Sequence, residues 1–231
     1  MTIANTPEIA AKIPETMPDG TPLKPLSRVI LDRRATSHFK PDPVPQEYLN
    51  AILQLASQAP SGYDLQPWRF IVVKDEQNRR RLQKAAMNQA KVGEAPVVII
   101  AIGMKEETKR RADEVFQEAA QRGADNPDAV QQHERQAMDF LEHIPMNVWL
   151  NRHVMIAFTT MMYAAEAYGF DTAPMEGFDP AAVKKEFGIP DEAEVVALLA
   201  IGKMRPPDKP YPGRFELDRI AYRERYGQPW T

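Results

Sequence analysis

Three continuous apolar segments constrain the fold of this chain more than any other feature. They occupy residues 70–73, 96–102 and 194–202, and each is rich in valine, isoleucine or leucine. A short run that is apolar at almost every position is typical of a strand whose two faces are both covered. The segments between them show helical spacing, so the sequence predicts an α+β fold with more helix than strand around a central, covered sheet.

Five segments around these strands are predicted to be helices. In residues 45–56, apolar side chains recur at three- and four-residue spacing, and Pro45 stands where a helix can begin. Asp75 and Asp179 stand where N-cap residues belong, and Gly188 supplies a left-handed stop. The expected helices are residues 26–31, 45–56, 75–85, 148–168 and 179–187.

Two neighbouring segments, residues 105–121 and 126–143, are dense in charge and sparse in apolar positions. We expect them to form an exposed cap of two helices, joined by a mobile turn at residues 123–127. Residues 148–168, in contrast, are apolar nearly all round and are expected to be buried, with Trp149 in the core rather than in a lid.

The 231-residue chain shows no linker and no change of composition that would mark a second domain. We expect a single domain over residues 26–231, preceded by a proline-rich arm over residues 1–25. Prolines block regular pairing and favour an extended, polyproline-like chain, so the arm either drapes over a partner subunit or is disordered. Its prolines are Pro7, Pro14, Pro18, Pro22 and Pro25.

Charge and composition exclude several functional classes. The formal net charge of −3 does not attract nucleic acid or an anionic membrane surface. The chain has no cysteine, which excludes disulfides, thiolate nucleophiles and cysteine-ligated metals. The four histidines lie on separate segments without metal-ligand spacing, and no signal-peptide pattern or membrane-spanning run is visible. We therefore expect a cytoplasmic protein without a metal site.

Two arginines and one loop are the main candidates for binding a cofactor. Arg33 and Arg34 follow the first predicted helix, where two forked guanidiniums suit a phosphate better than a lysine does. A solvated helix end, favourable against the negative pole of the helix dipole, is the alternative. The loop at residues 60–66 offers a backbone that a flat ring can approach, and Asp64 and Gln66 can bond to ring edges. The alternative for this loop is an ordinary connection between a helix and a strand.

Two further segments carry groups that could face a ring. Asn88 and Lys91 put an amide and a cation just before the second strand, although a polar helix end explains them equally well. The Pro174-Met-Glu-Gly-Phe178 segment lies between two predicted helices, where Gly177 relieves backbone crowding. Its alternative is a plain tight connection.

The chain lacks the nucleotide and nucleophile motifs of several other enzyme classes. No strand runs into Gly-x-Gly-x-x-Gly, and neither a Walker A loop nor Gly-x-Ser-x-Gly occurs. Chemistry without an evident protein nucleophile, metal or acid–base pair points to a cofactor that does the reaction itself.

Four sequence blocks together resemble the FMN-dependent nitroreductase family. They are Arg-Arg-x-x-x-x-Phe from Arg33, Ala-Pro-Ser-x-x-x-x-Gln-Pro-Trp-Arg-Phe from Ala59, Asn-x-x-Lys from Asn88 and Pro-Met-Glu-Gly-Phe-Asp from Pro174. The resemblance implies a central mixed β-sheet covered by helices, in an intertwined homodimer with FMN at the subunit interface. It also implies hydride transfer from NADH or NADPH through flavin N5 to a nitroaromatic, quinone or related acceptor, with ping-pong kinetics.

The resemblance assigns residues to the flavin. Arg33, Arg34 and Arg214 would hold its phosphate or ribityl end, and the 60–66 loop would come from the other subunit. Lys91 would stabilise negative charge at the pyrimidine edge, and a backbone N–H of Glu176 or Gly177 would lie near N5, with no catalytic side chain. The residues implied to bind the cofactor are Arg33, Arg34, Ala35, Ser37, Pro60, Ser61, Gly62, Asp64, Gln66, Asn88, Lys91, Pro174, Met175, Glu176, Gly177 and Arg214.

This chain departs from the family pattern at three positions. Ala35 and Ser37 stand where many members carry a serine and a basic residue, so one hydroxyl and one positive charge are lost. We expect weaker FMN retention unless Lys91 or His38 compensates. Asp64, where asparagine is common, would discourage an anionic acceptor.

Three alternatives stay open at this stage. A specialised flavoenzyme of the same fold would perform dehalogenation, enone reduction or flavin fragmentation. A flavin-binding protein would hold FMN without turnover. A dimeric structural protein would use the four blocks only to determine its fold.

Overall fold

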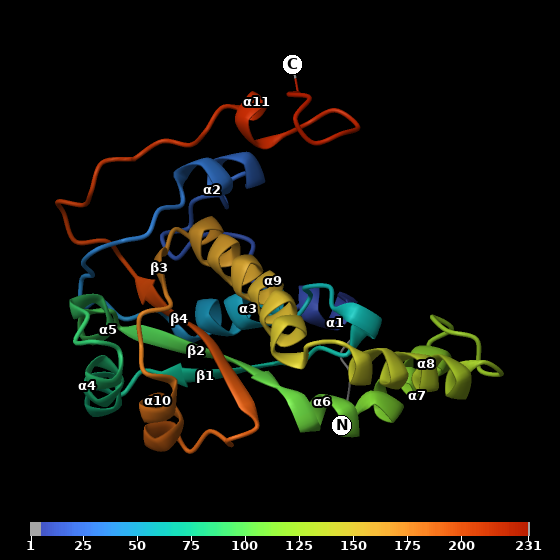
Figure 1. The fold of residues 1–231 in the computed structure, drawn as a ribbon. Coiled ribbons are helices and arrows are strands. Elements are labelled where there is room, and N and C mark those ends of the chain that lie inside the picture. Colours follow the sequence, from blue (N-terminus) through green and yellow to red (C-terminus); the bar gives the residue numbers. More distant parts are fainter. Residues whose placement is uncertain (1–5, 231) are drawn as a thin grey trace.

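The computed structural model describes residues 6–230, and a four-stranded sheet runs through its centre (Figure 1). The strand order is β1-β2-β4-β3. Three of the strands are those predicted from the apolar segments, and β3 is an addition at one edge. The strands are β1 (Trp68–Val73), β2 (Val97–Met104), β3 (Asp171–Met175) and β4 (Ala193–Gly202).

All neighbouring strands in this sheet are antiparallel. Val73 pairs with Val98, so the chain between them leaves the sheet and returns to it at the same end. In the part of the chain that the structure describes, parallel pairing is limited to an isolated bridge between Ala35 and Thr172. The mixed character implied by the resemblance is therefore confined to that bridge.

Helices cover both faces of the sheet, as the continuous apolar strands require. The helices α3 (Gln46–Ala56) and α9 (Met146–Ala167) pack on one face. The helices α4 (Glu76–Ala85), α5 (Ala90–Glu94) and α10 (Pro180–Phe187) pack on the other. Alternate residues of β2 point to opposite faces, and because both faces are covered every residue of this strand is buried.

The predicted helix ends are confirmed at two caps. An Asp75 carboxylate oxygen accepts a hydrogen bond from the Asn78 N–H at 2.9 Å and so begins α4. Asp179 accepts from the two N–H groups of Ala181 and Ala182 at the start of α10, which ends at Gly188 with a left-handed φ of 63°.

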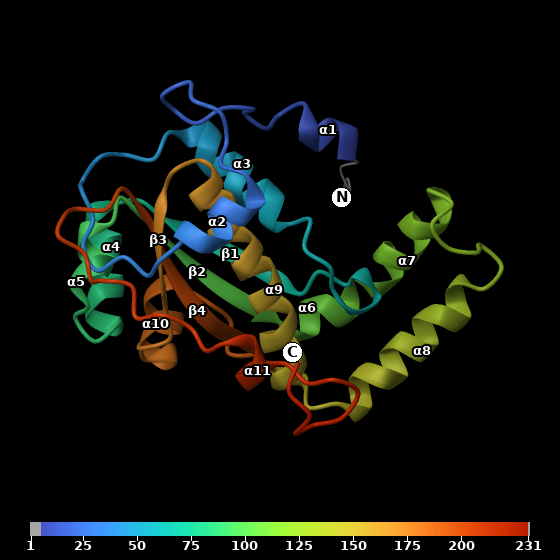
Figure 2. The same cartoon turned by 90° about the horizontal axis from the view of Figure 1, so that it is seen from above.

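The charged segments form three helices, of which α7 (Ala112–Gln121) and α8 (Val130–His143) project from the rest as a pair (Figure 2). The single helix expected at residues 105–121 is wrong, because Arg111 leaves helical geometry between α6 (Lys105–Arg110) and α7. Trp149 is 4% exposed and belongs to the apolar cluster beneath this cap, which confirms its place in the core.

Over its described residues the proline-rich arm contains a helix and a turn, so it is not one continuous extended segment. It begins with α1 (Thr6–Ala10), where Pro7 stands in the first turn, a position that tolerates proline. A turn then brings Thr16 and Pro22 together as a β-bridge. The Tyr168 hydroxyl donates to the Pro14 carbonyl oxygen at 3.1 Å, so the arm is held on its own chain. Residues 1–5 of the predicted arm lie outside the described residues.

Two remaining short helices are α2 (Leu26–Asp32), which matches the predicted helix, and α11 (Leu217–Ile220) near the C-terminus. A short 3-10 turn, η1 (Gly62–Asp64), lies within the 60–66 loop. Within residues 6–230, no helix is both long enough and apolar enough to span a bilayer.

Candidate cofactor site

The arginine pair lies directly after α2. Arg33 caps that helix, and its backbone N–H donates to the Val29 carbonyl oxygen. Its side-chain nitrogen Nη1 is buried and has no hydrogen-bond partner among residues 6–230. Because an unsatisfied buried donor is unfavourable, this nitrogen fits an anionic ligand such as a phosphate. A merely solvated helix end would not bury it.

Tyr211 brings Arg34 and Arg214 to one place. The guanidinium carbon of Arg34 lies 3.9 Å from the centre of the Tyr211 ring, and that of Arg214 lies 5.4 Å from it. Both distances are within the range of a cation–π contact. The C-terminal segment therefore carries a third guanidinium to the arginine pair.

The segment that follows the arginines is attached to the edge strand β3. The Thr36 N–H donates to the Thr172 carbonyl oxygen at 3.0 Å, beside the bridge between Ala35 and Thr172. The Ser37 N–H donates to a carboxylate oxygen of Asp208 at 3.3 Å. Burial by itself raises the pKa of Asp208, but hydrogen bonds from Lys209 and Ser37 outweigh it and lower the pKa. An ionised carboxylate therefore lies beside the backbone of Ser37, the position at which the family pattern has a basic residue.

Glu94 at the end of α5 connects this segment to the third block. One of its carboxylate oxygens accepts from the Phe39 N–H at 3.2 Å and lies 3.1 Å from Nδ1 of His38. Arg205 donates to its other oxygen at 3.0 Å. These contacts fix α5, which carries Lys91, against the chain that follows the arginine pair.

Lys91 lies in a partly buried position near a second cation. Burial lowers its pKa, and the positive charge of Lys209 lowers it further. Asn88, three residues earlier, adopts a left-handed φ of 55° in the turn between α4 and α5. A nearby negative charge would relieve the repulsion between the two lysines, so this pair fits the electron-rich edge of a flavin.

The fourth block meets the third through Gln89. Its side-chain amide donates to the Gly177 carbonyl oxygen at 2.7 Å. Pro174 and Met175 belong to β3 and not to a plain connection, because an edge strand tolerates a proline that donates no hydrogen bond. Glu176, which follows the strand, is exposed. The residues expected along the flavin ring therefore end an edge strand beside α5.

The 60–66 loop is built around internal hydrogen bonds. The Ser61 hydroxyl accepts from the Gln66 N–H at 2.9 Å, and the Gln66 side-chain amide donates to Asp64 at 3.3 Å. Burial raises the pKa of Asp64, and the bond from Gln66 lowers it to a smaller extent. A side-chain carbon added at Gly62 would lie 3.2 Å from the Trp149 indole nitrogen, so the loop packs closely against α9. Pro60, at the start of the loop, is exposed.

This loop lies at one end of β2, and the block at residues 88–91 lies at the other. The Pro67 carbonyl oxygen, directly after the loop, accepts from the N–H of Met104 at the last position of β2, whereas α5 precedes Val97 at its first. Eight residues of strand span roughly 25 Å. One chain therefore gathers the blocks at residues 33–37, 88–91 and 174–177 but keeps its own 60–66 loop apart from them.

Two residues that the sequence reasoning missed hold this arrangement together, and a third adds a positive charge to it. Gln89 joins two blocks, Tyr211 joins two arginines, and Lys209 acts on Lys91. Gln89 lies inside the Asn-x-x-Lys block and could have been selected for its amide. Tyr211 and Lys209 lie in a segment without apolar periodicity. The sequence signal for them was limited to their residue types: an aromatic ring and a cation a few positions before Arg214.

Comparison with known proteins identifies the family. The model of the nitroreductase family matches residues 30–203. A protein of Thermus thermophilus named NADH dehydrogenase is 35% identical over 192 residues, which cover 83% of this chain and 92% of that protein. The crystal structure of YdfN from Bacillus subtilis, described as a candidate nitroreductase, has a TM-score of 0.79 and 27% identity over 85% of this chain and 97% of that one.

A second solved structure has a similar fold and contains a flavin. It is described as a candidate nitroreductase of Exiguobacterium sibiricum in complex with FMN, with a TM-score of 0.78 and 24% identity over 86% of this chain and 96% of that one. The family match includes all four sequence blocks and all four strands of the sheet. This chain belongs to the nitroreductase family.

Proposed function

We propose that this protein is an FMN-dependent oxidoreductase that oxidises NADH or NADPH and reduces a nitroaromatic, quinone or related acceptor by a ping-pong mechanism. FMN, when bound, supplies the atom that accepts a hydride and later gives it up. Membership of the nitroreductase family, a relative named NADH dehydrogenase and a structural neighbour crystallised with FMN support the enzyme class and both cofactors.

The observation that carries the proposal is the gathering of three separate sequence blocks and the C-terminal segment at one end of the sheet. Arg33, Arg34 and Arg214 would hold the phosphate or ribityl end, and the buried Nη1 of Arg33 would donate to it. Ala35 and Ser37 would line the same end through their backbone.

The remaining residues of this end would hold the ring system. Asn88 and Lys91 would contact the pyrimidine edge, where the cation favours negative charge. The residues from Pro174 to Gly177 would lie along the ring, with an N–H of Glu176 or Gly177 directed to N5. Gln89 holds the Gly177 carbonyl, which belongs to the peptide that follows the Gly177 N–H, at 2.7 Å and so limits rotation of the backbone around Gly177.

A homodimer would complete the site. Because roughly 25 Å of strand separates the 60–66 loop from α5, the loop of the partner subunit, with Pro60, Ser61, Gly62, Asp64 and Gln66, would close the site of this chain. Large apolar side chains that are exposed in the single chain support a second copy as their cover. In the C-terminal segment they include Phe215, Leu217 and Trp230, and on α2 Leu26 and Leu31, each more than half exposed.

Ping-pong kinetics follow from a single pocket that serves both substrates. The nicotinamide would leave before the acceptor reaches the ring, and the projecting α7 and α8 helices would shape the space that each occupies (Figure 2). Parallel lines in double-reciprocal plots are the expected kinetic result, and intersecting lines would contradict this mechanism.

The visible spectrum of the purified protein tests the function. The protein is mixed with FMN, freed of excess, and titrated without oxygen with NADPH and then with NADH. A flavin spectrum that bleaches, and returns when a quinone or nitroaromatic is added, is the expected result. Bound flavin that stays oxidised would favour a binding protein without turnover, and no bound flavin would overturn the assignment. Light scattering that shows a monomer with tightly bound FMN would refute the shared site.

A further inference from the structure

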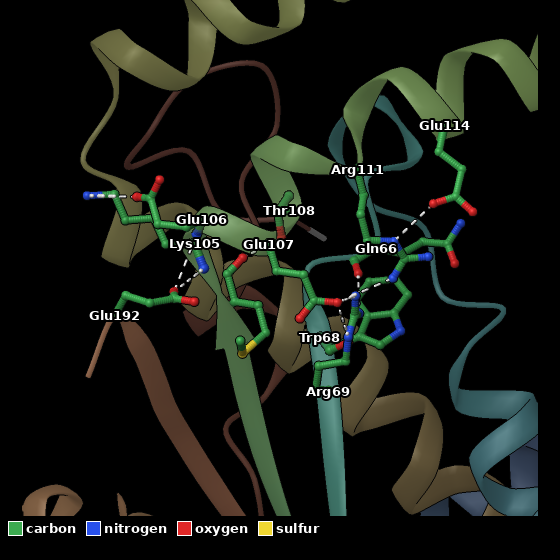
Figure 3. A network of polar contacts seen from close by, with 11 residues as sticks. Gln66, Trp68, Arg69, Lys105, Glu106, Glu107, Thr108, Arg111, Glu114 and Glu192 are labelled. Carbon is green, nitrogen blue, oxygen red and sulfur yellow. Dashed lines mark hydrogen bonds and ion pairs between the residues drawn. The ribbon is translucent and has the colours of Figure 1, made fainter. Parts of the chain in front are cut away.

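One guanidinium connects the 60–66 loop to the first helix of the cap (Figure 3). Arg69, near the start of β1, donates through Nε and Nη2 to the same carboxylate oxygen of Glu107, at 3.1 and 2.5 Å. Its third nitrogen, Nη1, donates to the carbonyl oxygens of Trp68 at 2.6 Å and of Gln66 at 3.3 Å. Arg69 therefore contacts α6 on one side and the last residue of the loop on the other.

The carboxylate of Glu107 is itself held in place from the cap. Arg111, between α6 and α7, lies 3.5 Å from the same Glu107 oxygen and 3.3 Å from a carboxylate oxygen of Glu114 (Figure 3). Burial by itself raises the pKa of Glu107, but the hydrogen bond and charge of Arg69, followed by those of Arg111, outweigh it and lower the pKa. Glu107 is therefore an ionised acceptor between two arginines, and such charge-assisted bonds are stronger than neutral ones.

The loop that Arg69 reaches has an unfavourable backbone. Tyr63, Asp64 and Gln66 have φ values of 55°, 52° and 44°, in the left-handed region that residues other than glycine rarely adopt. Such a conformation persists only where the surroundings impose it. Two of these three residues, Asp64 and Gln66, belong to the set assigned to the cofactor.

Apolar packing alone does not hold the loop. Leu65 is 5% exposed and anchors it in the cluster beneath the cap. A cavity of about 70 Å³ lies next to this anchor, so part of the loop has no close packing on the side of α6 and α7. The cavity is lined by Leu65, Gln66, Trp68, Arg69, Thr108, Arg111 and Val115. The polar contact from Arg69 to the Gln66 carbonyl crosses the same region and ties the end of the loop to β1 and α6.

We propose that Arg69 is a positioning residue for the cofactor: paired with Glu107, it holds the 60–66 loop in the conformation that closes the FMN site of the partner subunit. The inference rests on the proposed function and adds to it a residue that touches neither flavin nor substrate. It also joins the loop to the cap, so that movement of α6 would change the cofactor site.

The test compares Arg69→Gln, Glu107→Gln and the double variant in the full-length protein. FMN dissociation constants are measured by flavin fluorescence on the cofactor-free protein, and hydrogen exchange of the 60–66 backbone is measured before FMN is added. We expect each single variant to weaken FMN binding about tenfold and the double variant to be no worse, because both remove one interaction. Exchange should accelerate in the loop and stay unchanged in β2.

A second ion pair in the same cap supplies the control. Glu118 on α7 accepts from Arg122, directly after that helix, at 2.6 Å, and it lies about two helical turns beyond Arg111, so Glu118→Gln should leave FMN binding within twofold of the unsubstituted protein. Arg69→Lys keeps the charge but lacks the fork, and it should restore binding only in part.

Two results would overturn the proposal: unchanged FMN binding in both single variants with a lower melting temperature, or unchanged loop exchange. If Arg69→Gln does not fold, Glu107→Gln decides by itself. If the unsubstituted protein binds no FMN, the proposed function fails, and the exchange experiment still tests whether Arg69 holds the loop.

Discussion

The guanidinium carbon of Arg34 lies 3.9 Å from the centre of the Tyr211 ring, which joins two segments separated by most of the sequence. Tyr211 is about half exposed and stands in a C-terminal segment whose residues 209–220 are all exposed. The ring faces Arg214 on the same segment at 5.4 Å. Tyr211 therefore sets where two of the three proposed phosphate-binding cations lie before FMN binds.

Replacing Tyr211 should weaken FMN binding without unfolding the protein. An exposed cation–π contact contributes about 0.5–1 kcal/mol, so Tyr211→Leu should raise the dissociation constant of FMN roughly two- to fivefold. Tyr211→Phe keeps the ring face and should behave like the unsubstituted protein. The matched control is Tyr226→Leu, because Tyr226 lies on the same segment and is 91% exposed. Equal FMN binding in all three variants would show that the ring does not position Arg34.

Replacing Arg33 should have opposite effects on FMN binding and on the stability of the cofactor-free protein. Arg33→Met keeps an apolar stem and removes the buried, unpartnered Nη1, so the free energy of unfolding without FMN should stay the same or rise by about 1 kcal/mol. Loss of charge-assisted bonds worth about 1.5–3 kcal/mol should weaken FMN binding roughly 10- to 100-fold.

Arg28→Met is the control for this prediction. Arg28 lies on α2 and forms an exposed i,i+4 pair with Asp32 at 2.8 Å, so its loss removes the same charge from the same region. FMN titration and chemical denaturation should show little change. A destabilised Arg33→Met protein with normal FMN affinity would contradict the role given to Nη1.

FMN affinity should fall in alkaline solution because of Lys91. Its pKa lies below the ordinary 10.5, so the unfolded chain holds this proton more tightly than the folded protein does. Without FMN, the contribution of Lys91 to the free energy of unfolding therefore rises as the pH increases from the lowered pKa to 10.5. An anionic ligand favours the protonated lysine, so FMN affinity should fall as the pH passes the lowered pKa.

Two variants separate the causes of this shift. Lys209→Met removes the repulsion between the lysines, so the fall in FMN affinity should move to higher pH, with burial as the remaining cause. Lys91→Met should remove this part of the pH dependence. Titration of FMN binding between neutral and alkaline pH measures both, and an identical profile in all three proteins would exclude Lys91 as the titrating group.

The covered sheet was predictable because continuous apolar sequence indicates each of its three longer strands. Every residue of β2 is buried, and such a run has few other stable arrangements. The missed strand, β3, contains Pro174, which is unfavourable in a central strand and acceptable only at an edge such as the one it occupies. Sequence patterns do not show which strand will lie at an edge, because that depends on the pairing of the others.

The site was predictable as blocks but not as an arrangement. Nothing local to Arg69 indicates that it reaches both Gln66 and Glu107, because a contact between residues 38 positions apart depends on the sheet and cap. The left-handed backbone at Tyr63 was equally hidden, since tyrosine does not favour it and tertiary contacts impose it. The helix α1 in the proline-rich arm was not predicted, because its prolines argue against regular structure there. Proline is tolerated in the first turn of a helix, where Pro7 stands.

Removing the Gln89 amide should change the reduction potential of bound FMN more than its affinity. Gln89 donates to the Gly177 carbonyl at 2.7 Å, and the peptide groups around Gly177 are those proposed to face flavin N5. In Gln89→Leu this carbonyl loses its partner and the backbone on both sides of Gly177 gains freedom to rotate, so the neighbouring N–H directed to N5 should be less well aligned. Potentiometric titration should show a shift, whereas the FMN dissociation constant should change less than threefold.

Gln58→Leu gives the matched comparison. Gln58 is exposed, and its side-chain amide donates a long hydrogen bond of 3.4 Å to the Ser57 hydroxyl. It should leave both the potential and the affinity unchanged. If Gln89→Leu weakens FMN binding strongly at an unchanged potential, Gln89 acts on the cofactor as a whole and not through the Gly177 peptide. If neither quantity changes, the contact between the third and fourth sequence blocks stabilises the fold alone.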